Sequence, residues 1–450
     1  MPAEVHIQHT TEVVKTRNHP AENVMDTRQK SMNVLFLSTC YPHRSAPVRG
    51  TYNYELCGAM QNFARMRVVS PRPWPEVVCN WRRSPLTAAN PEAIQTVWPT
   101  YLYPPKVMRH RYGQFMWRSI QKQVARTTAD FDTNWVLSYW AHPDGEAGIQ
   151  AARSVGAKSA VVIGGSDVLL ITREVRRRKC VQRVLCDSDA IFTVSEGLRQ
   201  KVIELGIEPE KIYTVRQGIN PEIFSSGLKS EARKRLKLAV DARIFLWVGR
   251  MVSVKQPSLL LEAFAQVRRA EPAAVLVCAG AGPLLEEMRR TVEQAGLCDA
   301  VLFQGAIPQS ELPDWYRAAN ATVLSSQSEG LPNVLRESLA CGTPFVSTNV
   351  GSISEIAAPE YSLLTRPNDA AELSGAMLEV LNDRYQAEAR AFTPRSWSDC
   401  AEEMIDIMST FREEPLPNGD APVSSGAVDG KSGETVRIAT LSPATGKQRA

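Results

Sequence analysis

The sequence lacks the features by which membrane-spanning and secreted proteins are recognised. Its 450 residues contain no run of about eighteen consecutive apolar residues, so we expect no transmembrane helix. The first thirty residues mix charges with His, Thr and Asn and have no apolar segment, which argues against a secretory signal. These absences predict a cytoplasmic protein.

Cysteine is present but has no pattern. The nine cysteines are scattered without a Cys-x-x-Cys pair, and Cys180 and Cys186 are the closest two in the chain. An odd, unpatterned set is typical of reduced thiols in a cytosol rather than of a disulfide framework or a zinc site. We therefore expect no metal centre and expect most cysteines to be core residues.

Charge is unevenly distributed along the chain. Residues 31–220 hold 25 Lys and Arg against 15 Asp and Glu, whereas residues 221–450 hold 23 against 29. The basic residues include a run of Arg173, Arg176, Arg177, Arg178, Lys179 and Arg183. Such a run fits either peripheral contact with an anionic inner membrane leaflet or an ordinary solvated helix face. No motif of a nucleic-acid reader accompanies it, so we expect no nucleic-acid partner.

The length and the alternation of elements predict two α/β domains. A chain of 450 residues is longer than one core usually organises, and buried strands alternate with helices in both halves. We expect a disordered leader at 1–30, a first Rossmann-like domain at 31–220 and a second at 221–395. A helix at 396–413 and a disordered tail at 414–450 would follow.

The segment 325–356 is the most informative stretch. It predicts a strand, a polar loop, a short helix beginning near Leu331-Pro332-Asn333, and a second strand. Unpaired N–H groups at such a helix start favour a phosphate, while Glu329 and Glu337 suit the hydroxyls of a sugar nucleotide. Two solvated glutamates on a surface helix are the simpler alternative.

Two cations follow the first strand of the second domain. Arg250 and Lys255 lie around a loop between a buried strand and an amphipathic helix. In a doubly wound sheet this loop would place both cations beside the phosphate position. A solvated loop could carry the same two charges.

The four residues Arg250, Lys255, Glu329 and Glu337 together resemble the donor-binding signature of glycosyltransferase family 4. The resemblance covers about residues 33–412 and is stronger in the second domain. It implies the GT-B fold, in which two Rossmann-like doubly wound domains face each other across a cleft and the helix at 396–413 packs on the first domain. It also implies a retaining transferase without a required metal, whose donor is a UDP-, GDP- or ADP-sugar.

The resemblance assigns a role to each donor-site residue. Arg250, Lys255 and the helix start at Leu331, Pro332 and Asn333 would stabilise charge on the departing diphosphate. Glu329 would bind hexose hydroxyls and Glu337 the ribose diol. No residue stands out as a carboxylate nucleophile, which fits attack on the same face as the departing phosphate.

The first domain resembles the family less closely. Gly50 lies in a loop like the one that approaches the donor or acceptor, although a glycine there also serves a plain turn. Gly164-Gly165-Ser166-Asp167 resembles the family's Gly-Ser-Asp, where Asp167 would accept a bond from the acceptor or cap a helix. The family's histidine positions are occupied by Leu137 and Tyr139, which leaves His142 as a candidate sugar ligand or a structural residue.

Two further motifs in the first domain have competing interpretations. Asp187-Ser188-Asp189 resembles the metal-binding D-x-D of another glycosyltransferase fold, but it precedes an interior strand and we interpret it as structural. Residues 71–105 predict an irregular excursion in which Trp74, Trp81, Trp98, Tyr101 and Tyr103 either stack on sugar rings or pack a loop.

The predicted function is transfer of a hexose to a saccharide or lipid-linked saccharide, in bacterial exopolysaccharide or other cell-surface glycan assembly. Two alternatives stay open. One is a nucleotide-sugar epimerase of GT-B fold, and the other is a catalytically silent partner protein that binds a nucleotide sugar.

Overall fold

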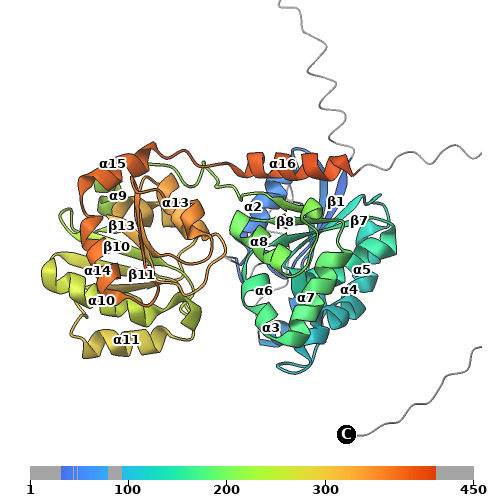
Figure 1. The fold of residues 1–450 in the computed structure, drawn as a ribbon, viewed down its shortest axis with the longest axis horizontal. Helices are drawn as coiled ribbons and strands as arrows, with labels where there is room; N and C mark the ends of the chain where they lie inside the picture. Colours follow the sequence, from blue (N-terminus) through green and yellow to red (C-terminus); the bar gives the residue numbers. More distant parts are fainter. Residues whose placement is uncertain (1–31, 44, 48, 80–93, 412–450) are drawn as a thin grey trace, which may run out of the picture. The chain divides into compact units, whose positions relative to one another are not determined.

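A computed structural model describes residues 32–43, 45–47, 49–79 and 94–411 (Figure 1). The expected leader at 1–30 and tail at 414–450 lie outside the described residues, and so does Trp81. Within the described part, two parallel sheets carry helices on their faces. The prediction of an α/β protein is confirmed.

The first sheet has seven parallel strands in the order β4-β2-β1-β6-β7-β8-β9. Its central strands are continuous apolar runs because helices cover both faces of the sheet. The strands are β1 (Asn33–Leu37), β2 (Arg65–Val69), β4 (Gln95–Val97), β6 (Trp135–Tyr139), β7 (Lys158–Ile163), β8 (Ala190–Thr193) and β9 (Ile212–Thr214). The helices between them are α2 (Thr51–Met60), α3 (Trp74–Cys79), α4 (Tyr112–Thr128), α5 (Glu146–Val155), α6 (Ser166–Leu169), α7 (Val175–Asp187) and α8 (Glu196–Glu204).

The second sheet has six parallel strands in the order β12-β11-β10-β13-β14-β15. The strands are β10 (Arg243–Val248), β11 (Ala274–Ala279), β12 (Val301–Gly305), β13 (Ala321–Leu324), β14 (Phe345–Thr348) and β15 (Ser362–Thr365). The accompanying helices are α9 (Lys229–Leu236), α10 (Pro257–Ala270), α11 (Leu285–Gln294), α12 (Leu312–Ala318), α13 (Asn333–Ala340), α14 (Ala370–Glu379) and α15 (Asp383–Ala391). Phe245, Trp247 and Phe264 are fully buried in the core on one side of this sheet.

The excursion expected at 71–105 is more regular than predicted where it is described. β3 (Arg72–Pro73) pairs with β5 (Thr100–Tyr101), and β4 joins the edge of the seven-stranded sheet beside β2. The prolines in this segment argued against strands, because proline has no backbone N–H to donate to a neighbouring strand. Edge strands and short two-stranded pairs tolerate that loss.

The chain crosses from the first sheet to the second near Ile219, which forms a bridge with Ser396. After α15 it returns as α16 (Trp397–Thr410), which packs along α2 beside the first sheet (Figure 1). The resemblance implied that the helix at 396–413 packs on the first domain, and this assignment stays a prediction. The predicted boundary at 220/221 falls between β9 and β10, and the boundaries themselves stay predictions.

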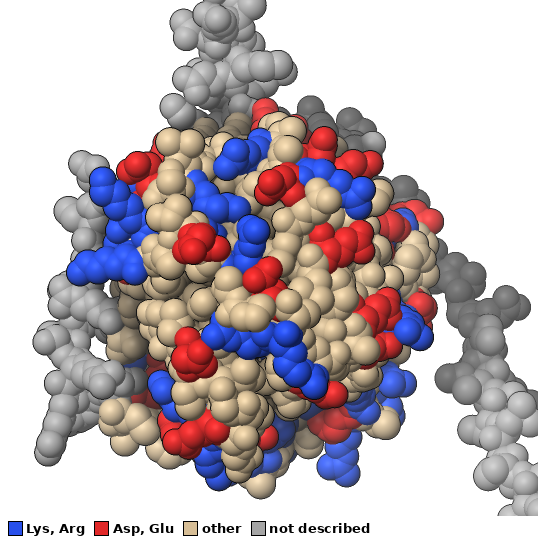
Figure 2. Space-filling view, turned by 90° about the vertical axis from the view of Figure 1, so that its left-hand side faces the viewer, with Lys and Arg blue, Asp and Glu red and all other residues tan. Residues whose placement is uncertain are grey.

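Charge on the second domain is mixed at the surface. Figure 2 shows the side that lies at the left of Figure 1, and there basic and acidic side chains alternate. The second domain also contains surface ion pairs, as between Arg235 and Asp314 at 2.7 Å and between Arg268 and Asp299 at 2.8 Å. Within the described residues, no helix combines the length and the apolarity needed to cross a bilayer.

The basic run of the first domain lies on α7, except for Arg173, which belongs to the preceding turn at Ile171–Arg173. Arg176, Arg178 and Lys179 are exposed, whereas Val181 and Val184 on the opposite face are buried. This amphipathic arrangement is that of a solvated helix face. Contact with an anionic membrane stays a prediction.

Candidate active site

The predicted strand–loop–helix corner is formed by β13, residues 325–332 and α13. Pro332 has extended backbone angles and occupies the N-cap position, so α13 begins one residue later, at Asn333. The helix ends where Gly342 adopts φ +74° and Thr343 donates its N–H to the Ser338 carbonyl at 2.9 Å. This left-handed glycine stop is a common helix end.

The loop after β13 is fixed against the loop after β10. Ser325 Oγ donates to the Lys255 carbonyl at 2.8 Å, and Gln327 N–H donates to the Val254 carbonyl at 2.8 Å. These two bonds hold the loop of Glu329 beside the loop of Arg250 and Lys255, although the two loops lie far apart in the sequence.

Lys255 and Glu329 form an ion pair at this junction. Lys255 Nζ lies 2.5 Å from Glu329 Oε1, and their side chains are 20% and 11% exposed. Ser326 Oγ donates to the same carboxylate oxygen. Arg250 stands nearby in the same cavity lining with an exposed side chain. The three residues predicted to act on the donor therefore share one site.

These residues line a cavity of about 950 Å³ that is bounded by loops of both sheets. That volume suits a ligand of drug or cofactor size. Of the predicted site residues, the cavity lining contains Gly50, Ser166, Arg250, Lys255 and Glu329. Glu337, Leu331, Pro332, Asn333, His142 and Asp167 lie outside that lining.

Glu337 is held by a neighbour rather than left free. Tyr316 Oη donates to Glu337 Oε2 at 2.8 Å. Burial raises the pKa of Glu337, while this hydrogen bond and the nearby Arg336 act to lower it. A carboxylate fixed in this way is oriented in advance, but its contact with a ribose diol stays a prediction.

Two glycines determine where the loops can lie. Gly50 has φ +65°, and a Cβ there would lie 2.2 Å from the Cys40 carbonyl oxygen. Gly351 has φ +60°, and a Cβ there would lie 1.9 Å from the Glu329 carbonyl oxygen. Gly351 thus lets the β14 loop pack directly behind the Glu329 loop.

Asp167 is buried, and its carboxylate accepts hydrogen bonds from backbone N–H groups. Its carboxylate accepts N–H bonds from Gly165 at 2.9 Å, Val168 at 3.2 Å and Ala141 at 3.3 Å. Burial raises the pKa of Asp167 to about 6 although these bonds act to lower it. The bonds from Gly165 and Val168 at the start of α6 favour the helix-start interpretation, and Asp167 is not among the residues that line the cavity.

A second buried carboxylate, Asp144, was missed by the sequence reasoning. It accepts bonds from Thr39 N–H at 2.8 Å and Ser38 Oγ at 3.1 Å, and so holds the loop that follows β1. Burial raises the pKa of Asp144 to about 7. An acid just after a strand end was the only signal in the sequence.

His142 does not face the cavity. Its residue is 1% exposed, and the ring lies beside Glu146 and Cys180. The role as a sugar ligand is therefore not supported by its position, because the turn after β6 sends Trp140 to the cavity lining instead. Tyr139, at a family histidine position, is buried and accepts a bond from Gln217 Nε2 at 3.1 Å.

The lining also contains Arg49, Tyr52 and Trp140, which sequence reasoning did not assign. Arg49 Nη1 is paired with Glu76 at 2.6 Å. Arg49 and Tyr52 flank Gly50 in the predicted loop, so the loop pattern could have indicated them. Trp140 could have been identified as a lining residue only from the direction of the turn that follows β6.

The other first-domain motifs have structural partners. Asp189 Oδ2 accepts from Ser159 N–H at 2.7 Å, and Asp187 pairs with Arg153 at 3.1 Å, which fits the structural interpretation of this D-x-D. Tyr101 and Tyr103 stack with ring centroids 5.1 Å apart, and Trp74 Nε1 donates to the Tyr103 carbonyl. This packing favours the loop interpretation of these aromatics.

Comparison with known proteins gives related glycosyltransferases. Residues 229–396 match the family described as "Glycosyl transferases group 1", and this range contains Arg250, Lys255, Glu329 and Glu337. The chain is 26% identical over 382 residues to the putative teichuronic acid biosynthesis glycosyltransferase TuaC of Bacillus subtilis, covering 80% of this chain and 95% of that protein. It is 31% identical to a D-inositol 3-phosphate glycosyltransferase of Thermomonospora curvata, over 62% of this chain and 63% of that protein.

Solved structures share the fold. Sucrose-phosphate synthase of Thermosynechococcus elongatus matches with a TM-score of 0.70 at 20% identity, covering 85% of this chain and 99% of that one. HepE of Anabaena matches with a TM-score of 0.65 at 15% identity, covering 84% and 100%. The predicted fold of two Rossmann-like domains is thereby confirmed, and together these comparisons support a glycosyltransferase with the GT-B fold.

Proposed function

We propose that this chain is a retaining hexosyltransferase that moves a sugar from a nucleoside diphosphate to a hydroxyl acceptor. The observation that carries the proposal is the ion pair between Lys255 and Glu329, which stands with Arg250 in one cavity lined from both sheets. A cation next to a carboxylate offers partners for a phosphate and for a sugar hydroxyl at adjacent positions.

The cations would act on the leaving group. Breaking the bond between the sugar and the diphosphate develops negative charge on phosphate oxygens, and positive groups fixed at that place stabilise the transition state. Glu329 holds the Lys255 ammonium in place before the donor arrives. Because two protein cations are available, we propose that transfer requires no divalent metal at this site.

The two acids would bind the hexose and the ribose of the donor. Glu329 would accept bonds from hexose hydroxyls, and Glu337, oriented by Tyr316, would accept from the ribose diol once the donor displaces or shares that bond. Among the described residues that line the cavity, Glu329 is the one acid, and it is already paired with Lys255. This supports same-face attack without a carboxylate nucleophile.

Relatives of this chain support the choice of donor class and acceptor class. HepE structures were solved in complex with UDP and with UDP-glucose, and the TuaC name refers to teichuronic acid biosynthesis. We therefore propose a UDP-sugar donor and a saccharide or lipid-linked saccharide acceptor in cell-surface glycan assembly. Family 4 membership, with retention, is part of this proposal.

A donor screen tests the proposal. We expect one of the UDP-, GDP- or ADP-sugars to raise the melting temperature of the wild-type chain, because a ligand that binds the native state stabilises it. Transfer to an added acceptor, followed by NMR of the new anomeric centre, should show the donor's configuration retained. A reaction prepared without Mg²⁺ should transfer at the same rate as one with added Mg²⁺.

Two outcomes would contradict it. Conversion of the donor sugar without any second substrate would identify a nucleotide-sugar epimerase. Donor binding without transfer or hydrolysis, across a broad acceptor set, would indicate a catalytically silent binding protein.

A further inference from the structure

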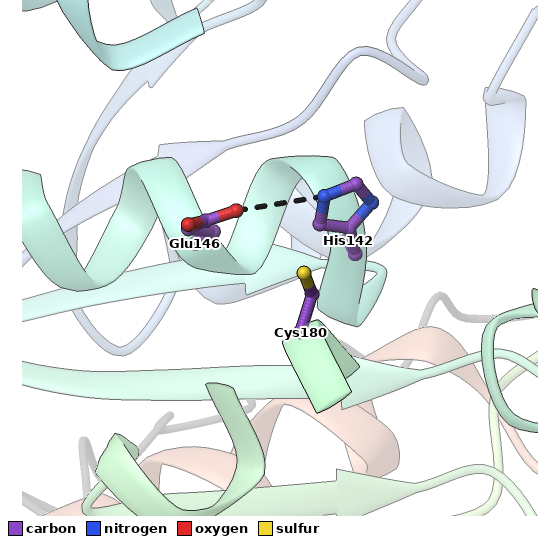
Figure 3. Close-up of side chains that lie close together, drawn as sticks. All are labelled: His142, Glu146 and Cys180. Atoms are coloured by element: carbon purple, nitrogen blue, oxygen red, sulfur yellow. Dashed lines mark ion pairs between the residues drawn. The ribbon is translucent and has the colours of Figure 1, made fainter. Parts of the chain in front are cut away.

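A buried cluster of three metal-ligating side chains lies in the first domain. His142 comes from the turn η2 (Ala141–Gly145), Glu146 from the start of α5 and Cys180 from α7. Figure 3 shows the imidazole, the carboxylate and the sulfur directed toward one another. One ligand atom from each lies within 4.8 Å of the other two.

Part of this cluster has no hydrogen-bond partner. Both ring nitrogens of His142 and Glu146 Oε2 are buried without one, and His142 and Glu146 are 1% and 7% exposed. Buried polar atoms are nearly always satisfied, because desolvating them without a partner costs free energy. His142 Nε2 and Glu146 Oε2 are joined only by the 3.5 Å ion pair drawn in Figure 3, and His142 Nδ1 has no hydrogen-bond partner. This weakly satisfied cluster is able to accept a ligand.

The separation between His142 and Glu146 fits two ligands of a small ion better than a hydrogen bond. His142 Nε2 and Glu146 Oε2 lie 3.5 Å apart, beyond the usual range of an N–H···O bond. Two ligand atoms at roughly 2.0–2.2 Å from a tetrahedral zinc ion are themselves separated by about 3.3–3.6 Å. The observed separation therefore fits one edge of such a tetrahedron.

We propose that His142, Glu146 and Cys180 bind one transition-metal ion of the zinc class. Imidazole nitrogen, carboxylate oxygen and thiolate sulfur are the three protein ligand types that zinc accepts. Hard ions such as Mg²⁺ and Ca²⁺ prefer oxygen ligands alone, so this mixed set disfavours them. The site lies apart from the donor cavity, since none of its ligands lines that cavity.

A neighbouring cation orients the carboxylate without occupying the free oxygen. Arg183 Nη2 donates to Glu146 Oε1 at 2.8 Å, which leaves Oε2 for the ion. Partners of this kind fix the orientation of metal ligands in known sites. Gly113 packs so closely that a Cβ there would lie 2.3 Å from Oε2, so the carboxylate has little freedom to turn away.

Cysteine ligation requires loss of the thiol proton. Burial and the Glu146 carboxylate raise the pKa of Cys180, whereas Arg183 and Arg177 lower it and Glu174 raises it. A divalent ion bound between the sulfur and the Glu146 carboxylate would offset the repulsion between the thiolate and that carboxylate. The bond that Cys180 Sγ now donates to the His110 carbonyl at 3.1 Å would then be given up.

Glu146 is the one proposed ligand that lines a surface pocket, of about 350 Å³, which it shares with Arg183. We assign the fourth coordination position to a water entering from the side of this pocket. The sequence predicted no metal centre because its cysteines form no paired pattern. His142 and Glu146 are four residues apart in the chain, and only the fold brings Cys180 beside them.

Metal binding is the direct test. The wild-type full-length chain is stripped with a chelator, dialysed and titrated with Zn²⁺ and Co²⁺. We expect one equivalent to bind, a raised melting temperature, and for Co²⁺ a near-ultraviolet thiolate charge-transfer band. Cys180→Ser should abolish that band and weaken binding at least about a hundredfold, and His142→Asn should weaken binding similarly.

Cys186→Ser is the matched control, because Cys186 is an exposed cysteine on the same helix. It should bind Zn²⁺ and Co²⁺ like the wild type. The proposal is overturned if the wild type binds less than stoichiometric metal, or if the Co²⁺ band persists in Cys180→Ser. The wild-type titration decides even where a ligand variant fails to fold. Donor binding is measured separately, so failure here leaves the transferase proposal intact.

Discussion

The two sides of the cavity differ in chemistry. The second domain contributes Arg250, Lys255 and Glu329, whereas the first domain contributes Arg49, which is paired with Glu76, together with small and apolar residues and the rings of Tyr52 and Trp140. The first domain does have carboxylates near its strand ends. Its Asp144 and Asp167 are fully buried and hold backbone N–H groups instead.

This contrast separates two uses of polar residues at strand ends. In the second domain the charges remain available to a ligand, because the loops are held by other bonds such as that from Ser325 Oγ to the Lys255 carbonyl. In the first domain the acids themselves fix the loops. A variant of the first kind should therefore change turnover, and a variant of the second kind should change stability and its dependence on pH.

The largest effect is expected for Lys255→Ala. Removal of one preorganised charge from a leaving-group site lowers turnover by roughly 10²–10³-fold, and the fold should be retained because Lys255 is partly exposed. Initial rates and a urea unfolding curve measure the two properties. Lys234→Ala, which removes an exposed lysine on α9, is the control. Near-normal turnover of Lys255→Ala would contradict the role of Lys255 in stabilising the leaving group.

We expect Asp144 to contribute a few kcal/mol to the free energy of unfolding, in a way that changes with pH. Its pKa in the folded chain, about 7, lies above the value near 4 of an unfolded aspartate. The folded state therefore binds the extra proton, and this contribution to stability is complete below about pH 4 and is lost as pH rises through about 7.

Asp144→Asn removes that loss. Relative to wild type, the free energy of unfolding of the variant should rise as pH increases from about 4 to about 7. Urea unfolding at several pH values measures it, with the exposed Asp132→Asn as the control. A difference between variant and wild type that stays constant with pH would contradict the buried-acid interpretation.

Gly351→Ala should cost about 1–3 kcal/mol. The residue has φ +60°, and its new Cβ would meet the Glu329 carbonyl oxygen at 1.9 Å, so the loop that carries Glu329 must move. We expect weaker donor binding together with the stability loss. Gly375→Ala on α14, where a Cβ meets nothing within 4 Å, should be neutral or stabilising. Unchanged donor affinity in Gly351→Ala would show that the loop position is not critical.

The smallest effect concerns a contact that links the two sides. Glu355 accepts N–H bonds from Gly197 at 2.8 Å and Glu196 at 3.0 Å, at the start of α8. Glu355→Gln removes the negative charge there and should cost about 0.3–1 kcal/mol. The exposed Glu360→Gln is the control. Equal unfolding curves for both variants would show that the carboxylate charge is not needed at this contact.

Sequence reasoning was most accurate where local pattern and spacing suffice. The strand around Leu35, the helix start at Asn333 and the grouping of Arg250, Lys255 and Glu329 could be read from apolar runs, turn residues and loop positions at strand ends. It was least accurate for the first domain. There the direction of one turn decided that Trp140 lines the cavity and that His142 is buried.

The sequence by itself determined the alternation of buried strands and helices, and with it the parallel sheets whose strand ends meet at one edge. It also determined which second-domain residues stand at that edge. Only the tertiary structure decided which polar groups face the cavity and which satisfy buried backbone. That choice depends on desolvation and on partners distant in the chain, as for Asp167 with Ala141, or His142 with Glu146 and Cys180.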